Sequence, residues 1–468
     1  MMRVLSVASE CVPLVKTGGL ADVAGALPGA LAREGVEMRT LLPGYPAVMA
    51  AADGPAHDLG DLFGGPARLV EGRLGEATLY ALDAPHLFDR PGGIYLGPDG
   101  QDWPDNPQRF AALSRTAARV AAEGVGGWQP QVMHLHDWQA GLAPLYLGTQ
   151  AAGSGVATLL TIHNIAFQGL APAAMIDTLG LPPAGFTPEG YEYWGQVSAL
   201  KAGLVHADAI STVSPTYASE LLTPEFGLGL DGVLRARRAD LCGILNGIDE
   251  DAWTPPYRTP RGKGRHTRRL RDELGLPERE GPLAVVISRL TGQKGLDLLI
   301  EALPALIDGG GQLALLGSGE PVLEAAFRDA AAASPHVAVR IGYDEALSRR
   351  MIAGGDAILV PSRFEPCGLT QLYGLRFGTV PVVARTGGLA DTVIDANPAA
   401  ISAGVATGLH FHPVTADRLA QALVKMTALW HDRTLWQRMM RNAMAQPVGW
   451  DVSARAYADL YRSLATPS

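Results

Sequence analysis

Two adjacent glycines, Gly18 and Gly19, open a helical pattern shortly after the first apolar run of the chain, Val4–Ala8. Glycine has no side chain, so backbone N–H groups at such a turn can approach a ligand, and the positive end of the helix favours an anion. Lys16 adds a mobile cation beside them. The spacing is neither G-x-G-x-x-G nor that of a Walker loop, so the motif predicts an anion-binding loop without identifying the anion.

A second set of cations, Arg289 and Lys294, flanks a glycine-containing turn after the apolar run Ala284–Ile287. Open α/β sheets bind ligands at the carboxyl ends of their strands, where this turn would lie. Two cations there suit a diphosphate whose charge grows as it leaves, whereas ion pairing at the surface is the ordinary alternative. Because both cations flank one turn, we favour a diphosphate-binding site over surface ion pairing.

Glu365 lies between the apolar run Ala357–Val360 and a further helical pattern. A carboxylate here could cap the helix or take part in catalysis, and the local sequence favours neither. Cys367 could be a thiol nucleophile, but no histidine neighbours it in sequence, so a packed thiol is the better interpretation. The residues that open the helix could present N–H donors to phosphate or sugar. They are Gly368, Leu369 and Thr370.

Histidines and an aspartate end two more apolar runs, as His134-Leu135-His136-Asp137 and as His163. They could ligate a metal, but strand alternation lets only some of them converge, and no carboxylate cluster completes a site. A hydrogen-bonded polar histidine is the usual alternative. Since these residues share the expected sheet edge with Lys16, we expect hydrogen bonding to a polyol and no metal.

The elements that must position these residues are short β-branched or leucine-rich runs separated by helical patterns. Buried strands that alternate with helices predict parallel sheets covered on both faces. The runs fall into two successive groups, which predicts two doubly wound α/β domains. The first group is Val4–Ala8, Met38–Leu42, Val132–Leu135, Thr158–Ile162, Ala209–Val213 and Leu241–Leu245, and the second is Ala284–Ile287, Gln312–Leu316, Val337–Ile341, Ala357–Val360 and Val380–Val383.

The same pattern predicts an N-terminal domain over 1–250, a connector over 251–281, a C-terminal domain over 282–447 and a terminal helix over 448–468. The connector is rich in proline and arginine. We interpret it as a solvated loop rather than a polyanion site, because no aromatic residues interleave its charges. Four residues form an apolar stripe along the terminal segment: Trp450, Tyr457, Leu460 and Tyr461.

One short motif occurs twice. Thr17–Val23 reads TGGLADV and Thr386–Val393 reads TGGLADTV, each between an apolar run and a helical pattern. Shared helix-start chemistry accounts for the similarity, because both places suit a tight strand-to-helix turn. One copy can bind a ligand while the other only turns the chain.

The 468-residue chain has a formal net charge of −9, with 47% hydrophobic and 18% charged residues. This balance fits a packed globular protein, and it predicts no general attraction to nucleic acid or to anionic membranes. The three cysteines are scattered without C-x-x-C spacing. Since neither a signal peptide nor a membrane-spanning run is expected, these features predict a cytoplasmic protein.

Taken together, the motifs resemble those of bacterial glycogen synthases and plant starch synthases over nearly the whole chain. The resemblance implies the GT-B glycosyltransferase architecture, with two facing Rossmann-like domains, an interdomain cleft and a last helix that crosses back to the first domain. It also implies transfer of glucose from ADP-glucose to the non-reducing end of glycogen or another α-1,4-glucan, with retained anomeric configuration, release of ADP and no metal or other cofactor. The matching segments are Lys16–Val23, His136–Trp138, Lys201–Gly203, Val213–Tyr217, Leu245–Asp249, Ser288–Gly295 and Pro361–Tyr373.

The resemblance further implies roles for individual residues. Four act in catalysis: the diphosphate clamp Arg289 and Lys294, and Glu365 and His163 near the donor glucose. Tyr343 is implied to stack on adenine, and Tyr95 is a weaker donor-site candidate. All residues implied to bind substrate are Lys16, Gly18, Gly19, Asp22, Tyr95, Asp137, Asn246, Tyr343, Cys367, Gly368, Leu369 and Thr370.

The retaining transferases of this clan often carry a second glutamate where this chain has Tyr373, a departure that starch and glycogen synthases share. A double displacement needs a carboxylate on the opposite sugar face, and none is evident. We therefore expect front-face transfer, in which Arg289, Lys294 and helix-terminal dipoles stabilise the leaving diphosphate. The alternatives are a phosphorylase-like or sucrose-synthase-like transferase and a non-catalytic glucan- or nucleotide-binding protein. Stacking on Tyr343 tolerates either base, so the choice of adenine rests on the resemblance.

Overall fold

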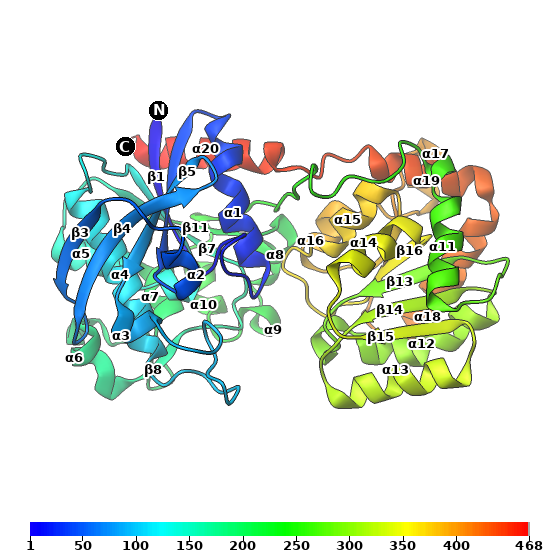
Figure 1. Ribbon diagram of the computed structural model, residues 1–468, viewed down its shortest axis with the longest axis horizontal. Coiled ribbons are helices and arrows are strands. Elements are labelled where there is room, and N and C mark those ends of the chain that lie inside the picture. Colours follow the sequence, from blue (N-terminus) through cyan, green and yellow to red (C-terminus); the bar gives the residue numbers. More distant parts are fainter. Residues whose placement is uncertain (467–468) are drawn as a thin grey trace. The chain divides into compact units, whose positions relative to one another are not determined.

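The computed structural model describes residues 1–466, and the chain divides into two compact units (Figure 1). Unit 1 comprises Met1–Val213, Ala218–Leu245 and the segment from Trp450 onward. Unit 2 comprises Ser214–Tyr217 and Asn246–Gly449. No helix within 1–466 is both long enough and apolar enough to cross a lipid bilayer.

Unit 1 contains a nine-stranded sheet in the order β12-β11-β7-β6-β1-β2-β5-β4-β3. Neighbouring strands are parallel from β12 to β5. Val4 of the central strand pairs with Met38 on one side and Val132 on the other, and all three are buried. The strands are β1 Met2–Val7, β2 Val36–Pro43, β3 Ala56–Asp61, β4 Pro66–Leu74, β5 Ala77–Asp83, β6 Val132–His136, β7 Ala157–Ile162, β11 Ala209–Thr212 and β12 Leu241–Gly243.

Helices and one small antiparallel sheet complete unit 1. The sheet consists of β8 Leu170–Pro172, β9 Glu192–Tyr193 and β10 Gln196–Ser198. The longer helices are α1 Gly19–Ala32, α4 Asn106–Glu123, α5 Ala143–Gln150, α7 Ala199–His206 and α20 Trp450–Ala465. The shorter ones are α2 Pro46–Met49, α3 Pro85–Phe88, α6 Ile176–Leu179, α9 Pro224–Gly227 and α10 Asp231–Ala236, while α8 Pro215–Glu220 begins in residues of unit 2.

Unit 1 also contains strands that were not predicted from the sequence. Strands β3, β4 and β5 form an antiparallel meander at one end of the large sheet. The turn between β4 and β5 is short, with Gly75 at φ 60°, and so short a connection can join only antiparallel strands. Strand β3 has no buried residue and β4 largely alternates buried and exposed residues, so neither contains the continuous apolar run from which strands were predicted. Strand β5, by contrast, is buried from Leu79 to Asp83.

Unit 2 contains a six-stranded, fully parallel sheet in the order β15-β14-β13-β16-β17-β18. Alternate residues pack on opposite faces: Val286 with α12 and α18, and Val285 with α11 and α14. These helices are labelled in Figure 1. The strands are β13 Leu283–Ile287, β14 Gln312–Gly317, β15 Val337–Ile341, β16 Ala357–Val360, β17 Val380–Ala384 and β18 Leu409–Phe411. The helices are α11 Gly264–Leu274, α12 Leu296–Asp308, α13 Pro321–Ala333, α14 Glu345–Gly354, α15 Thr370–Phe377, α16 Gly387–Thr392, α17 Pro398–Ala403, α18 Ala416–His431 and α19 Arg433–Met444. Every strand expected from the sequence forms in one of the two units, with small shifts at its ends.

The last helix, α20, packs within unit 1. Trp450, Tyr457 and Tyr461 are buried with Val23 and Leu27 of α1 in one apolar cluster. The Tyr461 hydroxyl also lies 2.8 Å from Nδ1 of the buried His134 in β6. The apolar stripe of the terminal segment is thus core, and α20 joins the far end of the chain to the first sheet.

The segment expected to be a solvated connector is instead part of unit 2. Residues 264–274 form α11, whose Leu270 is buried against α14. The buried Lys263 Nζ donates to the Tyr257 hydroxyl (2.9 Å), the Ile352 carbonyl (3.0 Å) and Thr379 Oγ1 (2.6 Å). Burial lowers the pKa of Lys263 to about 7. Helix α11 was not predicted because its arginines outnumber the residues of its narrow apolar face, although that face is enough to pack a short helix against its neighbours.

We predict that Lys263→Ala destabilises unit 2 by roughly 2–4 kcal/mol, because it leaves a cavity and removes the common donor of three buried oxygens. Arg269→Ala, at an exposed position of the same helix, is the matched control and should behave like the unmodified chain. Thermal unfolding of the three proteins measures the difference. Equal unfolding temperatures would mean that the segment is a detached connector.

Candidate active site

In unit 1 the candidate residues follow the carboxyl ends of three neighbouring parallel strands. The loop with Lys16, Gly18 and Gly19 follows β1, Asp137 follows β6, and His163 follows β7. Because the ends of parallel strands meet at one edge of a sheet, the topology brings these loops together.

A carboxylate that the sequence argument missed organises the first loop. Glu10 Oε2 accepts the Gly18 N–H (3.1 Å), the Thr17 hydroxyl (2.9 Å) and the Thr17 N–H. The residue is only 4% exposed. The anion at the start of α1 is therefore the protein's own carboxylate, and the helix dipole favours it there. An acidic residue just beyond the first strand, upstream of a Gly-Gly helix start, is the sequence signal that could have identified it.

Of the two glycines, only Gly19 remains open to a ligand. The expectation was that both would present N–H groups, but the Gly18 N–H is used by Glu10. Gly19 is exposed, and a Cβ added to it would meet nothing within 4 Å. Lys16 Nζ lies 2.8 Å from Asp22 Oδ1, and the Lys16 side chain is half exposed. The loop thus presents one cation, Lys16, and one open glycine, Gly19, at a helix start that hydrogen bonds to Glu10 hold in place.

Asp137 adopts a left-handed backbone conformation, with φ 55°. Its Oδ1 accepts the N–H groups of His163 (2.7 Å) and Asn164 (3.3 Å), and its own N–H donates to the Thr161 carbonyl. Burial raises the pKa of Asp137 to about 7, against the two N–H donors, which lower it. Asp137 therefore fixes the backbone that carries His163.

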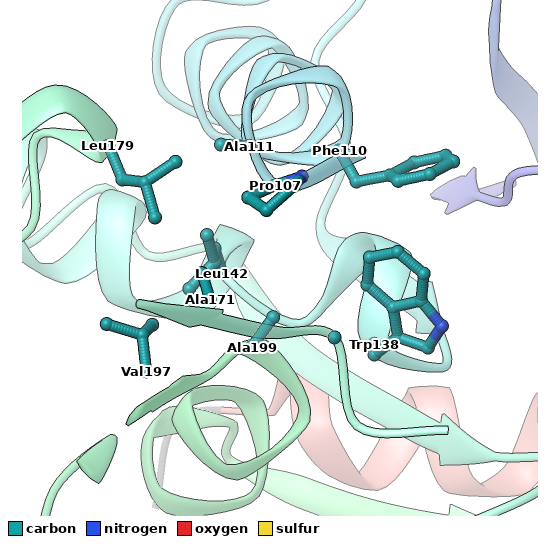
Figure 2. Close-up of a pocket in the computed structure, with 10 residues that line it drawn as sticks. Pro107, Phe110, Ala111, Trp138, Leu142, Ala171, Leu179, Val197 and Ala199 are labelled. Atoms are coloured by element: carbon teal, nitrogen blue, oxygen red, sulfur yellow. The ribbon is translucent and has the colours of Figure 1, made fainter. Parts of the chain in front are cut away.

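The neighbouring Trp138 packs against Phe110 and the backbone of Gly169. Its ring packs edge-on against Phe110 at 4.9 Å between centroids, and both rings border a small apolar cavity (Figure 2). A Cβ on Gly169, which has φ 61°, would lie 2.2 Å from the indole, so only glycine lets the ring sit there. Apart from the indole N–H of Trp138, the side chains that line the cavity are apolar.

The three histidines divide into core and site. His134 bonds to Thr161 Oγ1 at 2.6 Å and to Tyr461 inside the core. His163 Nε2 lies 3.0 Å from His136 Nδ1, and His136 Nε2 lies 3.1 Å from Ser6 Oγ. Burial lowers the pKa of His163 to about 3, so it is a neutral imidazole near pH 7. Within the described residues, no three His, Cys, Asp or Glu side chains gather as a metal site.

Tyr95 lies beside the same loops, and its hydroxyl is 2.6 Å from Ser9 Oγ. Burial, together with the charge of Glu10, raises the pKa of Tyr95 well above its usual value. The side chain therefore acts as a neutral hydrogen-bonding group next to Glu10.

In unit 2, Glu365 is the centre of a buried polar cluster after β16. Its Oε2 accepts from Lys294 Nζ (2.6 Å) and from the Ser362 hydroxyl (2.8 Å). Glu365 is 8% exposed. The ion pair joins the loop after β13 to the loop after β16, two strands that are neighbours in the sheet. Of the two roles that the sequence left open for Glu365, this geometry disfavours helix capping, because its described partners are side chains rather than the start of α15.

Backbone and ion-pair contacts fix the same two loops. Gly295 has φ 65°, and a Cβ on it would lie 2.0 Å from the Pro361 carbonyl oxygen, so glycine is required for this approach. Arg363 donates to both carboxylate oxygens of Asp297, at 2.7 and 2.6 Å. Arg289, by contrast, is exposed, and no side-chain partner is found for it within 1–466. It is therefore free to meet an anion at this edge.

The second TGGLAD copy supports the Glu365 loop by close packing. A Cβ on Gly387 would lie 2.0 Å from the Glu365 carbonyl oxygen, and one on Gly388 would lie 2.2 Å from that of Cys367. The Gly388 N–H donates to the Glu365 and Pro366 carbonyls. This copy serves packing and turning, as the sequence allowed for one of the two.

Asn246 and Cys367 lie together in unit 2. The Asn246 backbone donates a hydrogen bond to the Cys367 thiol, whose pKa burial raises to about 12. The thiol is thus packed and un-ionised, as expected, and unsuited to nucleophilic attack. Asn246 Oδ1 is buried without a partner among the described residues, which suits an acceptor for a substrate hydroxyl.

The remaining candidates lie at the same edge of the second sheet. Tyr343 follows β15 and is 85% exposed, so its ring face is open for stacking. The helix α15 begins at Thr370, close to its expected start. No acceptor for the N–H groups at this start is found in the part of the chain that the structure describes. These groups belong to Gly368, Leu369 and Thr370.

Two family models match this chain: the starch synthase catalytic domain over residues 3–236, and glycosyl transferases group 1 over residues 267–445. A glycogen synthase of Paracoccus denitrificans is 72% identical over 467 residues, which cover 99% of this chain and 100% of that protein. The chain belongs to the glycogen synthase family. Another glycogen synthase, from Jannaschia sp., is 58% identical, with coverage of 99% and 100%.

Among solved structures, this member of the glycogen synthase family is similar to the catalytic domain of starch synthase IV from Arabidopsis thaliana bound to ADP and acarbose. The TM-score is 0.87 at 30% identity, and both chains are fully covered. A sucrose-phosphate synthase from Thermosynechococcus elongatus shares the fold at a TM-score of 0.60 and 19% identity. The family and the GT-B glycosyltransferase fold expected from the sequence are confirmed.

The buried histidines predict acid sensitivity of unit 1. The pKa of His134 is lowered by burial to about 3, so the unfolded chain binds a proton below about pH 6.5 that the folded state rejects. Stability should therefore fall as the pH drops from about 6.5 towards about 3, by up to ~1.4 kcal/mol per pH unit for each such histidine. Asp137 has a raised pKa, so the folded chain takes up a proton there as the pH falls, and this uptake offsets only part of the loss of stability.

The contribution of His134 can be isolated with His134→Gln. We expect this variant to be less stable than the unmodified chain near neutral pH and to lose less stability on acidification. The difference in the free energy of unfolding between the two proteins should therefore become smaller as the pH falls. Urea unfolding at about pH 7.5 and about pH 5 measures it. A gap that does not change with pH would show that His134 is protonated in the folded protein.

Proposed function

We propose that this chain transfers glucose from ADP-glucose to the non-reducing end of an α-1,4-glucan, with retention of anomeric configuration and release of ADP. The observation that carries this proposal is the buried Glu365, held by Lys294 and Ser362 at a strand edge where Arg289 stays exposed. The glycogen synthases that match the full chain support the activity, and the ADP and acarbose of the starch synthase structure support the donor and the acceptor. In this proposal, 1–250 supplies the acceptor side and 282–447 the donor side.

The diphosphate of the donor would be bound mainly by cations. Arg289 and Lys294 serve as its clamp, with the N–H groups at the start of α15 as neutral donors. Lys16 and the Gly19 N–H also bind the donor. Because the negative charge on the diphosphate grows as the glycosidic bond breaks, these groups stabilise the transition state more than the ground state.

The glucose would be held by polar groups rather than by a second carboxylate. Glu365, the neutral His163 and the open Asn246 Oδ1 are the proposed contacts. Tyr373, at the position where related transferases carry a glutamate, stacks on Trp253 at 3.7 Å between ring centroids. We therefore propose front-face transfer, in which the acceptor hydroxyl attacks on the side from which ADP leaves. A glucosyl adduct trapped on a protein carboxylate during turnover would overturn this mechanism.

The identity of the donor base is tested by a release assay with glycogen as acceptor. The exposed Tyr343 ring can stack on either base, so the proposal of adenine rests on the relatives. We expect ADP release from ADP-glucose at a rate far above that of UDP release from UDP-glucose. The opposite preference would overturn the donor assignment, and no turnover with either donor would favour a non-catalytic binding protein.

Lys16→Gln should raise the KM for ADP-glucose about 10-fold and change kcat less, because it removes a charge-assisted hydrogen bond to phosphate. Asp22→Asn is the matched variant, since it breaks the same ion pair but keeps the cation. It should raise the donor KM less. Equal increases in the two variants would show that the ion pair matters rather than contact with the donor.

Glu10→Gln should also raise the KM for ADP-glucose, several-fold, by loosening the loop that carries Lys16 and Gly19. In the unmodified chain, one carboxylate oxygen of Glu10 accepts three hydrogen bonds. The glutamine amide has a single, uncharged oxygen acceptor, so these bonds become weaker. The expected loss of stability is about 1 kcal/mol. Thr17→Val removes only the hydroxyl bond and should have the smaller effect. An unchanged donor KM in Glu10→Gln would contradict this positioning role.

Glu365→Gln should lower kcat at least ~100-fold while the protein stays folded, because the amide keeps the shape but not the charge beside the reacting sugar. Ser362→Ala removes one bond to the same carboxylate and should cost far less activity. Initial rates at saturating ADP-glucose and glycogen, with thermal unfolding as the folding control, separate the outcomes. Near-normal turnover by Glu365→Gln would exclude the carboxylate from catalysis.

A further inference from the structure

A concave surface of unit 2 surrounds the turn that precedes α11. We call it the arginine pocket. Tyr257, Gly262 and Gly264 line it together with four arginines, Arg258, Arg261, Arg265 and Arg268. The lining contains no aspartate or glutamate.

The arginines of this pocket are not neutralised by the protein. Within residues 1–466, none of the four forms an ion pair with a carboxylate, and the side-chain bonds found for Arg265 go to His266 Nε2 and to the Pro256 carbonyl. Other exposed arginines of unit 2, such as Arg350 and Arg363, are paired at 2.7 and 2.6 Å. Four like charges around one hollow repel one another, in a chain whose net charge is −9. An anion placed among them would relieve that repulsion.

The floor of the pocket is rigid. The Tyr257 hydroxyl donates to the Phe377 carbonyl (2.8 Å) and lies 3.2 Å from the Ala353 carbonyl oxygen, and the buried Lys263 donates to that hydroxyl. Arg258 and Arg261 therefore project from the segment before α11, which is anchored in the core of unit 2, and Arg265 and Arg268 project from α11 itself. The start of α11 adds its positive dipole end on the same side.

The pocket is separate from the proposed donor site. Phe377 ends α15 and Ala353 lies near the end of α14, and these helices lead into the amino ends of β17 and β16. Arg289, Lys294 and Glu365 instead follow the carboxyl ends of β13 and β16. The two sets of cations thus lie at opposite edges of one parallel sheet.

We propose that the arginine pocket binds a phosphorylated small molecule through its phosphate groups. Arginine suits this ligand because its planar guanidinium forms paired hydrogen bonds to phosphate oxygens. A nucleic-acid strand fits less well, because the one aromatic residue of the lining, Tyr257, is buried and offers no face for base stacking. The inference is independent of the reaction that the enzyme performs.

Titration calorimetry with inorganic pyrophosphate on the full chain tests the proposal. We expect a binding event that weakens at least about 10-fold in Arg261→Gln/Arg268→Gln, persists in Arg289→Gln, and weakens with added salt. Arg269→Gln, exposed on α11 but outside the pocket lining, is the matched control and should bind like the unmodified chain. The four exposed arginines are not needed for folding, so equal unfolding temperatures are expected.

Two results would overturn the proposal. If Arg289→Gln abolishes all pyrophosphate binding and the double variant binds normally, the donor site alone binds the probe. If the double variant loses binding to single-stranded RNA but not to pyrophosphate, the surface is a nucleic-acid site instead.

Discussion

The parallel arrangement of strands is the constraint on which the rest of the structure depends. Each strand of such a sheet ends at the same edge, so residues far apart in sequence arrive there together. In unit 1 this edge collects the Gly-Gly loop, Asp137 and His163, and in unit 2 it collects Lys294 and Glu365. The chemistry is then decided by which short loops follow the strands.

Buried carboxylates hold the loops in both units, but in different ways. Glu10 takes up N–H and hydroxyl donors at the start of α1, whereas Glu365 pairs with Lys294 and Ser362. Both are largely withdrawn from water, where unpaired charge would be costly and paired charge fixes geometry. The repeated TGGLAD motif serves these two carboxylates: its first copy donates to the Glu10 side chain, and its second packs against the backbone of Glu365.

The sequence predicted the features that depend on local pattern. The long apolar strands, the α20 stripe, the packed Cys367 and the start of α15 follow from periodicity and helix-start chemistry, and the seven motifs predicted the family. Features that depend on tertiary partners were missed. The role of Glu10 depends on the loop that folds back over it, and its place upstream of a Gly-Gly helix start was the one sequence signal for that role. Helix α11 was missed because its arginines outnumber its few apolar residues. Strands β3 and β4 of the meander were missed because exposed residues interrupt their apolar pattern.

We propose that the cations and the helix start at the carboxyl edge of unit 2 bind the ADP portion of the donor. A crystal structure of this chain with ADP is the decisive test. We expect phosphate oxygens within hydrogen-bond distance of Arg289 and Lys294, and adenine stacked on Tyr343. ADP bound elsewhere in unit 2, with Arg289 and Lys294 making no contact to it, would rule out this site.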